Sequence, residues 1–186
     1  ALEEVLAESS QTSVIHEPEA AYSVQKVKKQ GEYIVADYLA WPEDERIELI
    51  DGVIYDMSAP TDIHQLIILE LSTIFREYIR RHKGQCIPVI SPIDVQLGED
   101  DRTIVQPDIA IVCDRNKFKN GRIKGAPDLI VEVLSPSTRK KDMVTKLSKY
   151  MEAHVREYWI VDIDKKRVIV YADNGKDDID IGIYAF

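Results

Sequence analysis

The stretch Leu129-Ile130-Val131-Glu132-Val133-Leu134 is the most informative one for the fold, because it sets a carboxylate inside an apolar run. A short apolar run of this kind is typical of a buried strand. Burying an ionised carboxylate costs several kcal/mol unless hydrogen bonds or a cation compensate it. Glu132 is therefore expected to be either the partner in a buried salt bridge or part of a cation-binding site.

A second carboxylate, Asp108, opens the comparable run Asp108-Ile109-Ala110-Ile111-Val112. Taken alone, it is equally well explained as a cap at a strand end. Asp108 lies twelve positions before the turn residue Asn120, and Glu132 lies twelve after it. If the two strands pair in an antiparallel manner about that centre, the two carboxylates are cross-strand neighbours. Opposed like charges destabilise a sheet, and a shared Mg²⁺, or Mn²⁺ in its place, would remove the conflict.

The flanking segments alternate between strand and helix patterns. Asp51-Gly52 predicts a tight turn between two strands, and Thr61 or Asp62 is a suitable cap for a long helix to about Arg81. The apolar stripe of that helix is predicted at Ile63, Ile67, Leu71, Ile74 and Tyr78. The other expected elements are strands at Gln85–Ile90 and Ile93–Leu97, a helix from Ser137 to about Met151, a hairpin of Glu157–Ile163 with Arg167–Tyr171, and a strand at Ile179–Tyr184. This order predicts an α/β fold with a central mixed β-sheet flanked by helices.

Composition sets broader limits on the class of protein. The chain has 186 residues, 45% hydrophobic and 31% charged, with a net charge of −9. We expect a mobile or loosely packed leader at residues 1–30 and a single domain at 31–186. No apolar run approaches the roughly 20 residues that span a bilayer, and no signal-peptide pattern is present. Cys86 and Cys113 are expected as buried thiols in a reducing cytoplasm.

Two further residues are candidates for the same site. Glu48 follows Ile47 and precedes Leu49, so strand alternation places it on the opposite face from both, a pattern that by itself favours solvent exposure. Lys146 borders the predicted buried side of its helix, where it is either a surface lysine with a buried stem or a cation directed at the carboxylates. A serine hydrolase is excluded because Ser135 and Ser137 lie in no GxSxG motif, and the chain has no GxxxxGK[ST] loop.

Several stretches together resemble the Uma-type restriction-endonuclease family of bacteria, long known as a domain of unknown function, in the PD-(D/E)XK nuclease superfamily. The resemblance covers about residues 32–172. The matching stretches are Glu48–Gly52, His64, Pro107-Asp108, Pro127–Thr138, Asp142, Lys146-Leu147, Tyr150 and Glu157–Asp162. The combination of Glu132–Thr138, Lys146 and Tyr158-Trp159 is the specific part of the match.

The resemblance implies a restriction-endonuclease-like fold with Asp108 and Glu132 as metal ligands, assisted by the Val133 carbonyl. It also implies that Glu48 supplies a further acidic group and that Lys146 is the motif lysine. The superfamily spacing would place that lysine at position 134, which is Leu134 here. His64, in the first turn of the long helix, is expected to contact either substrate phosphate or a ligating carboxylate.

The function implied is Mg²⁺-dependent hydrolysis of DNA phosphodiester bonds, with Lys146 positioning the nucleophile or neutralising charge in the transition state. DNA is the expected partner, and a homodimer is expected because such folds often dimerise to cut two strands. The basic segments Arg115–Lys124 and Arg139–Lys141 are predicted to flank the site and contact phosphates. The alternative is a noncatalytic module that uses the same fold to bind DNA or protein.

Overall fold

The computed structural model describes residues 28–42, 44–98, 100–175 and 178–186. Most of the predicted leader, residues 1–27, lies outside this part of the chain. The described strands form two six-stranded sheets, which we call sheet A and sheet B. Sheet A has the order β2-β1-β5-β4-β8-β7, and sheet B has the order β12-β11-β10-β9-β6-β3.

The strands are short at the centre of the chain and longer toward its end. Those of sheet A are β1 (Ile47–Ile50), β2 (Val53–Asp56), β4 (Val95–Gln96), β5 (Ile104–Val105), β7 (Phe118–Lys119) and β8 (Arg122–Lys124). Those of sheet B are β3 (Ile87–Ile90), β6 (Ile109–Val112), β9 (Leu129–Val133), β10 (Glu157–Asp162), β11 (Arg167–Asp173) and β12 (Ile179–Ala185). The helical segments are α1 (Val35–Leu39), α2 (Asp62–Arg81), η1 (Arg115–Lys117), η2 (Lys141–Lys146) and α3 (Leu147–Glu152).

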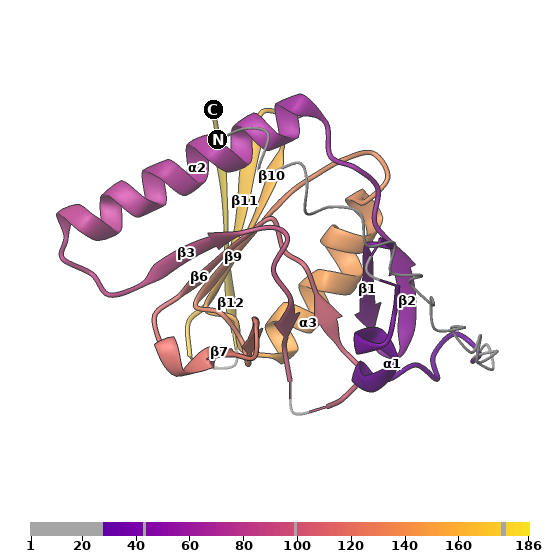
Figure 1. Ribbon diagram of the computed structural model, residues 1–186. Helices are drawn as coiled ribbons and strands as arrows, with labels where there is room; N and C mark the ends of the chain where they lie inside the picture. The colour runs from indigo at the N-terminus through magenta and orange to yellow at the C-terminus, as the bar shows by residue number, and fades with distance from the viewer. Residues whose placement is uncertain (1–27, 43, 99, 176–177) are drawn as a thin grey trace, which may run out of the picture.

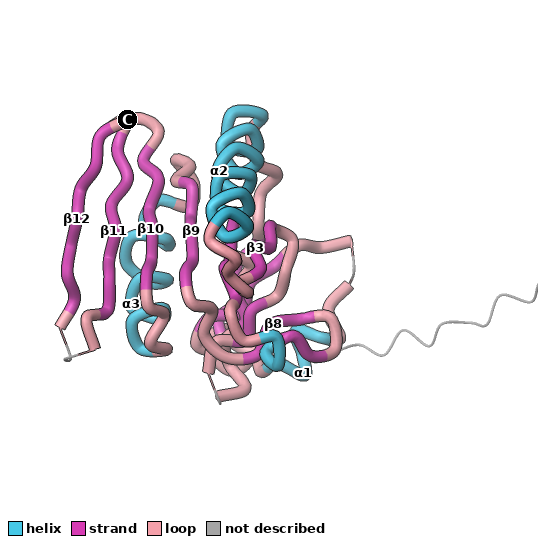
Figure 2. Tube along the Cα trace, turned by 90° about the vertical axis from the view of Figure 1, so that its left-hand side faces the viewer, coloured by secondary structure: helices cyan, strands magenta, loops and turns pink. Residues whose placement is uncertain are grey.

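Sheet B is the predicted central mixed sheet. Strands β9 and β10 are parallel, whereas β6 with β9 and β10 with β11 are antiparallel. Helix α2 lies against one face, and the continuous helix formed by η2 and α3 lies against the other (Figures 1 and 2). Residues 131 and 133 of β9 contribute to the core under α2, while residue 130 contributes to the core under α3. The expected α/β fold is confirmed.

Local sequence signals account for the main turns and for the start of α2. Asp51 and Gly52 both adopt positive φ, 52° and 77°, as a two-residue hairpin requires. The Thr61 hydroxyl accepts a hydrogen bond from the His64 backbone N–H at 3.3 Å, so it caps α2. The hairpin of β10 with β11 and the last strand, β12, also lie where the sequence predicted them.

The predicted apolar stripe of α2 is wrong in part. Ile63, Ile74 and Tyr78 are exposed, and the buried side of the helix is centred on His64 and Ile68. Ile67, Leu71 and Phe75 pack against the same core. The helix carries more apolar residues than one face can hold, so its sequence fits more than one apolar stripe. The predicted stripe is rotated partly away from the sheet.

The two cysteines are joined in a disulfide, so the prediction of buried free thiols is wrong. Strands β3 and β6 pair with Ile87 opposite Val112, and the next step of that register sets Cys86 opposite Cys113. Both side chains are only partly buried. The pairing of β3 with β6 brings the sulfur atoms together, and no turn signal in the sequence indicated that these two strands pair. No helix in the described residues has the length and apolarity to cross a membrane.

Candidate active site

The predicted register between the two carboxylate-bearing strands is confirmed. Strands β6 and β9 pair with Ile109 opposite Val131 and Ala110 opposite Ile130. Continuing this antiparallel register by one step sets Asp108 opposite Glu132, at the point where β6 begins and β9 is about to end. The turn at Asn120-Gly121 that centres this symmetry is itself formed, with positive φ at both residues.

Glu132 points from β9 toward the η2–α3 side of sheet B and is 3% exposed. Its Oε1 accepts a hydrogen bond from Lys146 Nζ at 2.7 Å and another from the Tyr150 hydroxyl at 2.8 Å. Lys146 and Tyr150 lie four residues apart on the helix, so they share the face that covers Glu132. The lysine therefore reaches the β9 carboxylate from the following helix, as the assignment of Lys146 as the motif lysine requires. Position 134, where the superfamily spacing would place a lysine, is Leu134.

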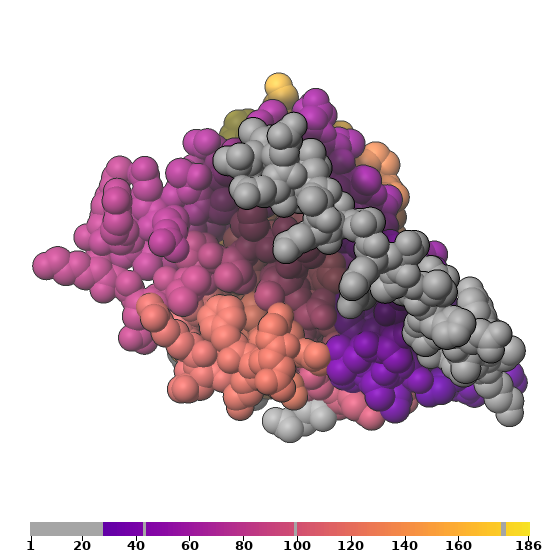
Figure 3. Space-filling view, viewed as in Figure 1, coloured from indigo at the N-terminus to yellow at the C-terminus, as the bar shows by residue number. Residues whose placement is uncertain are grey.

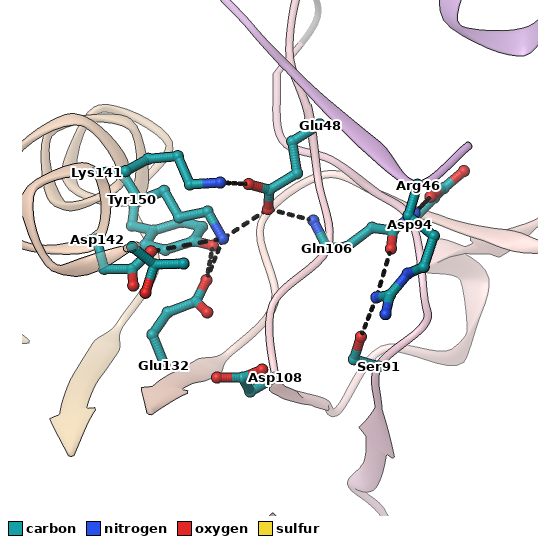
Figure 4. Close-up of polar contacts among 12 residues, drawn as sticks. Arg46, Glu48, Ser91, Asp94, Gln106, Asp108, Glu132, Lys141, Asp142 and Tyr150 are labelled. Carbon is teal, nitrogen blue, oxygen red and sulfur yellow. Dashed lines mark hydrogen bonds and ion pairs between the residues drawn. The ribbon is translucent and has the colours of Figure 1, made fainter. Parts of the chain in front are cut away.

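Glu48 is fully buried, so the solvent-exposed position that strand alternation favoured is wrong. Its Oε1 lies 2.6 Å from Lys146 Nζ, and its Oε2 lies 2.6 Å from Lys141 Nζ. The backbone N–H of Gln106 also donates to Oε1, at 2.9 Å. Both faces of β1 are covered because the η2 segment packs over the one that carries Glu48. Figure 4 shows Glu48 facing Lys141 and the Glu132 side of the cluster.

Burial and charge shift the pKa values of this cluster in opposite directions. Desolvation raises the pKa of Glu132 well above its usual value, against the opposing effect of Lys146. Desolvation also acts to raise the pKa of Glu48, but Lys146 and Lys141 outweigh it and the pKa is lowered. Desolvation opposes the charge on Lys146, but Glu132 and Glu48 outweigh it and its pKa is raised. Lys146 is therefore held charged between a carboxylate that is ionised and one that takes up a proton more readily.

Asp108 and His64 form the opposite side of the site. Asp108 Oδ2 accepts a hydrogen bond from the Val133 backbone N–H at 2.7 Å and lies 3.2 Å from His64 Nε2. The same Nε2 lies 3.0 Å from the Val133 carbonyl oxygen. Both partners are acceptors, so Nε2 carries the proton and donates. The hydrogen bond to Asp108, opposed by desolvation, raises the pKa of His64. His64 thus connects the start of α2 to Asp108 and to the end of β9.

A cavity of about 610 Å³ joins the two sides. Its lining includes four carboxylates and two lysines that belong to the cluster: Glu48, Asp108, Glu132, Asp142, Lys141 and Lys146. Carboxylates thus outnumber ammonium groups in this cluster. Neighbouring carboxylates, Asp108 among them, contribute to the raised pKa of Glu132. An arrangement with more carboxylates than ammonium groups at one edge of the sheet favours the binding of a cation.

The predicted basic segments are placed differently from each other. Lys141 lines the cavity, whereas Arg139 forms ion pairs with Asp162 and Asp164. No residue of 115–124 is among those that line the cavity in the described part of the chain. That segment forms the salmon-coloured surface on the same face as α2 in Figure 3. Of the basic residues predicted to flank the site, Lys141 is thus the one brought into it.

This donor set fits a magnesium ion whose coordination is completed by ligands other than protein side chains. The described residues contain no group of three or more His, Cys, Asp or Glu side chains arranged to hold a metal ion. Mg²⁺ is commonly held by one or two carboxylates, with waters and substrate phosphates completing its coordination. Asp108, Glu132 and the Val133 carbonyl would suit such a cation, and they would not suit one that demands a closed set of protein side chains.

Asp142 and Tyr150 of the cluster were not predicted as site residues from the sequence, and Lys141 was predicted only as part of a basic segment that flanks the site. Asp142 is buried, Tyr150 donates to Glu132, and Lys141 contacts Glu48. The helical spacing of Asp142, Lys146 and Tyr150 was a usable signal, because residues four apart lie on one side of a helix. The α-helical spacing does not include Lys141, which is five residues from Lys146, and its sequence signal was the basic run Arg139–Lys141.

Fold and site together define an α/β protein with a restriction-endonuclease-like central sheet and a buried carboxylate–lysine cluster at its edge. The chain belongs to the Uma2 family, whose model, described as "Putative restriction endonuclease", matches residues 35–180. An uncharacterized protein of Synechocystis sp. (strain PCC 6803) is 31% identical over 147 residues, which cover 76% of this chain and 75% of that protein. The family indicates a nuclease-type function.

A solved structure supports the fold. The crystal structure of a "putative nuclease belonging to DUF820" from Anabaena variabilis matches with a TM-score of 0.65. The match covers 80% of this chain and 83% of the Anabaena chain, at 21% sequence identity. At this identity the likeness bears on the fold alone.

Proposed function

We propose that this protein is a Mg²⁺-dependent endonuclease that hydrolyses DNA phosphodiester bonds. The observation that carries the proposal is the position of Glu132. It is buried in β9 and lies opposite Asp108 when the β6–β9 register is continued by one residue. Its Oε1 accepts a hydrogen bond from Lys146. A buried carboxylate paired with a lysine is often no more stable than an apolar replacement, and a role in binding a catalytic cation would explain why Glu132 is present. Membership of the Uma2 family supports the same class of reaction.

In this proposal Asp108, Glu132 and the Val133 carbonyl would hold the ion, which would be Mg²⁺ or, in its place, Mn²⁺. The bound ion would polarise the scissile phosphate and lower the pKa of a bound water. His64 orients Asp108 and the Val133 carbonyl through its Nε2 proton. Lys146 fixes Glu132 Oε1 and places positive charge where negative charge develops. Glu48 holds Lys146 from the opposite side.

The test is incubation of the protein with supercoiled, linear and branched DNA in Mg²⁺ or Mn²⁺. We expect cleavage that falls by about 100-fold or more in E132Q, because the polarising ion supplies several kcal/mol of stabilisation. E152Q is the matched control, since Glu152 is an exposed carboxylate on α3 that contacts Lys149 instead. Equal cleavage by E132Q and the wild type would place the activity at another site or in a contaminant.

A second candidate is a noncatalytic module that binds DNA or protein with the same fold. The observation in its favour is that the described residues hold no cluster of three or more side-chain metal ligands. Such a module would bind DNA equally well in EDTA and in Mg²⁺, and it would leave every DNA substrate intact. Fluorescence anisotropy with a labelled duplex, run beside the cleavage assay, separates the two candidates.

The oligomeric state and the location belong to the proposal as well. We expect a homodimer, which would bring two sites to the two strands of a duplex, and sedimentation analysis of the free protein measures this. We also expect a cytoplasmic location. The Cys86–Cys113 disulfide of the structure would be uncommon in a reducing cytoplasm, and cell fractionation followed by immunoblotting measures where the protein is located.

A further inference from the structure

The helix after β9 contains a widened turn where it passes the site. Residues Lys141–Lys146 form a π-helical segment, and α3 continues from Leu147. A hydroxyl from outside the helix, that of Tyr158, donates to the Asp142 carbonyl at 3.0 Å within this segment. π-Helical turns are rare and occur frequently at functional sites.

The widened turn has a direct effect on two lysines. In an α-helix, residues five apart point about 140° away from each other. In a π-helix the backbone hydrogen bonds join residues five apart, so these residues lie nearly in one row. Lys141 and Lys146 are five apart, and their ammonium groups contact the two oxygens of the same carboxylate, Glu48. The π turn therefore brings a second lysine to the site.

The two lysines differ in their surroundings. Lys146 has a 3% exposed side chain and three neighbouring carboxylates: Glu48, Glu132 and Asp142. Lys141 has a 14% exposed side chain and, among the described residues, Glu48 as its one carboxylate partner. Its Nζ also lies 5.6 Å from the ring centroid of Tyr55. A lysine ammonium has three donors, so Lys141 keeps donor capacity on the side that lines the cavity.

We propose that Lys141 contacts a phosphate oxygen of the nucleic acid, and that Glu48 is the positioning residue that holds it toward the cavity. This inference rests on the proposed function and adds a substrate contact to it. The ligand class follows from the surroundings of Lys141. The hydroxyls of Ser135, Ser137 and Thr138 line the same cavity at the start of the helix, and Arg46 lines it from β1's side. Cationic and hydroxyl donors that line one cavity suit an oxyanion.

The experiment compares K141M with K149M. Lys149 lies on the same helix and is similarly enclosed, with an 18% exposed side chain and carboxylate partners Asp51 and Glu152, but it does not line the cavity. Binding of a labelled duplex is measured in EDTA over a range of salt concentrations. K141M should weaken binding by roughly 3- to 10-fold near 0.1 M salt and reduce the log–log salt slope by about 1. K149M should keep the wild-type slope, and K141R should restore most of it.

A second measurement uses the unaltered protein, so it does not depend on the folding of a variant. Duplex DNA in EDTA should lower chemical acetylation of Lys141 relative to Lys149, as measured by mass spectrometry. In Mg²⁺, K141M should raise KM more than it lowers kcat, because a phosphate contact contributes binding to ground and transition states alike.

The outcomes separate this inference from the proposed function. Wild-type protein that cleaves DNA, with K141M and K149M giving the same salt slope and Lys141 unprotected by DNA, would overturn the role of Lys141 alone. Wild-type protein that neither binds nor cleaves DNA would overturn both. A reduced slope in K141M with protection of Lys141 supports the phosphate contact.

Discussion

Lys146 and Lys149 lie three residues apart on one helix, and each forms close ion pairs with two carboxylates. Lys146 lies 2.6 and 2.7 Å from Glu48 and Glu132. Lys149 lies 2.8 and 2.7 Å from Asp51 and Glu152. The distances are alike, but the carboxylate side chains that surround Lys146 are at most 5% exposed, whereas those of Asp51 and Glu152 are more than half exposed.

This difference shows why distance alone does not identify a functional site. Exposed ion pairs contribute about 0–1 kcal/mol and cost little to form. Buried ones cost several kcal/mol of desolvation per ion, and an apolar replacement of the whole set is often at least as stable. A buried cluster that contains more carboxylates than lysines is therefore better explained by function than by stability.

The largest effect is expected for K146M. Removing the ammonium leaves Glu48 and Glu132 buried with one fewer compensating charge, and breaking a buried pair in this way costs about 3–5 kcal/mol. Glu132 can take up a proton, since desolvation already raises its pKa, so we expect the lower end of that range. Urea unfolding of the variant measures the loss. A loss below about 1 kcal/mol, the value for a surface pair, would contradict the contrast.

A smaller loss, with a distinctive pH dependence, is expected for E48Q. Desolvation acts to raise the pKa of Glu48, but Lys146 and Lys141 lower it below its ordinary value of 4.5. Ionised Glu48 therefore stabilises the folded state fully above about pH 4.5 and loses this effect as the pH falls through the lowered pKa. E48Q should be less stable than wild type by about 2 kcal/mol near pH 7, because the glutamine oxygen still accepts a hydrogen bond from a lysine, and the difference should shrink below pH 4.5. Thermal unfolding from pH 3 to 7 measures it, and a gap that widens in acid would refute the assignment.

The smallest effect is expected for K149M. Its partners are largely exposed, so solvent screens the ion pairs and we expect a loss of about 1 kcal/mol or less. The pKa of Lys149 is raised mainly by its hydrogen bond to Asp51, and 0.5 M salt should remove most of the stabilisation. The same urea titration, with and without salt, provides the measurement. A salt-independent loss of several kcal/mol would mean that Lys149 is as buried in effect as Lys146.

Sequence signals predicted the features that depend on neighbouring residues. The turn at Asp51-Gly52, the Thr61 cap and the β10–β11 hairpin each arise from residues close together in the chain. The pairing of Asp108 with Glu132 was also predictable, because both strands are symmetric about one recognisable turn.

The sequence did not predict features that depend on how distant elements pack. The burial of Glu48 requires the η2 segment, 93 residues away at Lys141, to cover β1. The Cys86–Cys113 bond requires β3 to pair with β6, which no turn signal indicates. The π turn that presents Lys141 lies where Tyr158, from β10, donates a hydrogen bond to the Asp142 carbonyl. Helical and strand periodicities carry no information about such contacts.

The central claim is that Asp108 and Glu132 share a divalent cation, and calorimetric titration of the protein with Mg²⁺ or Mn²⁺ tests it most directly. We predict one site per chain in the wild type, no measurable binding in D108A, and unchanged binding in D164N, whose carboxylate lines the same cavity but pairs with Arg139. Equal binding by D108A and wild type, or no binding by the wild type, would contradict the claim.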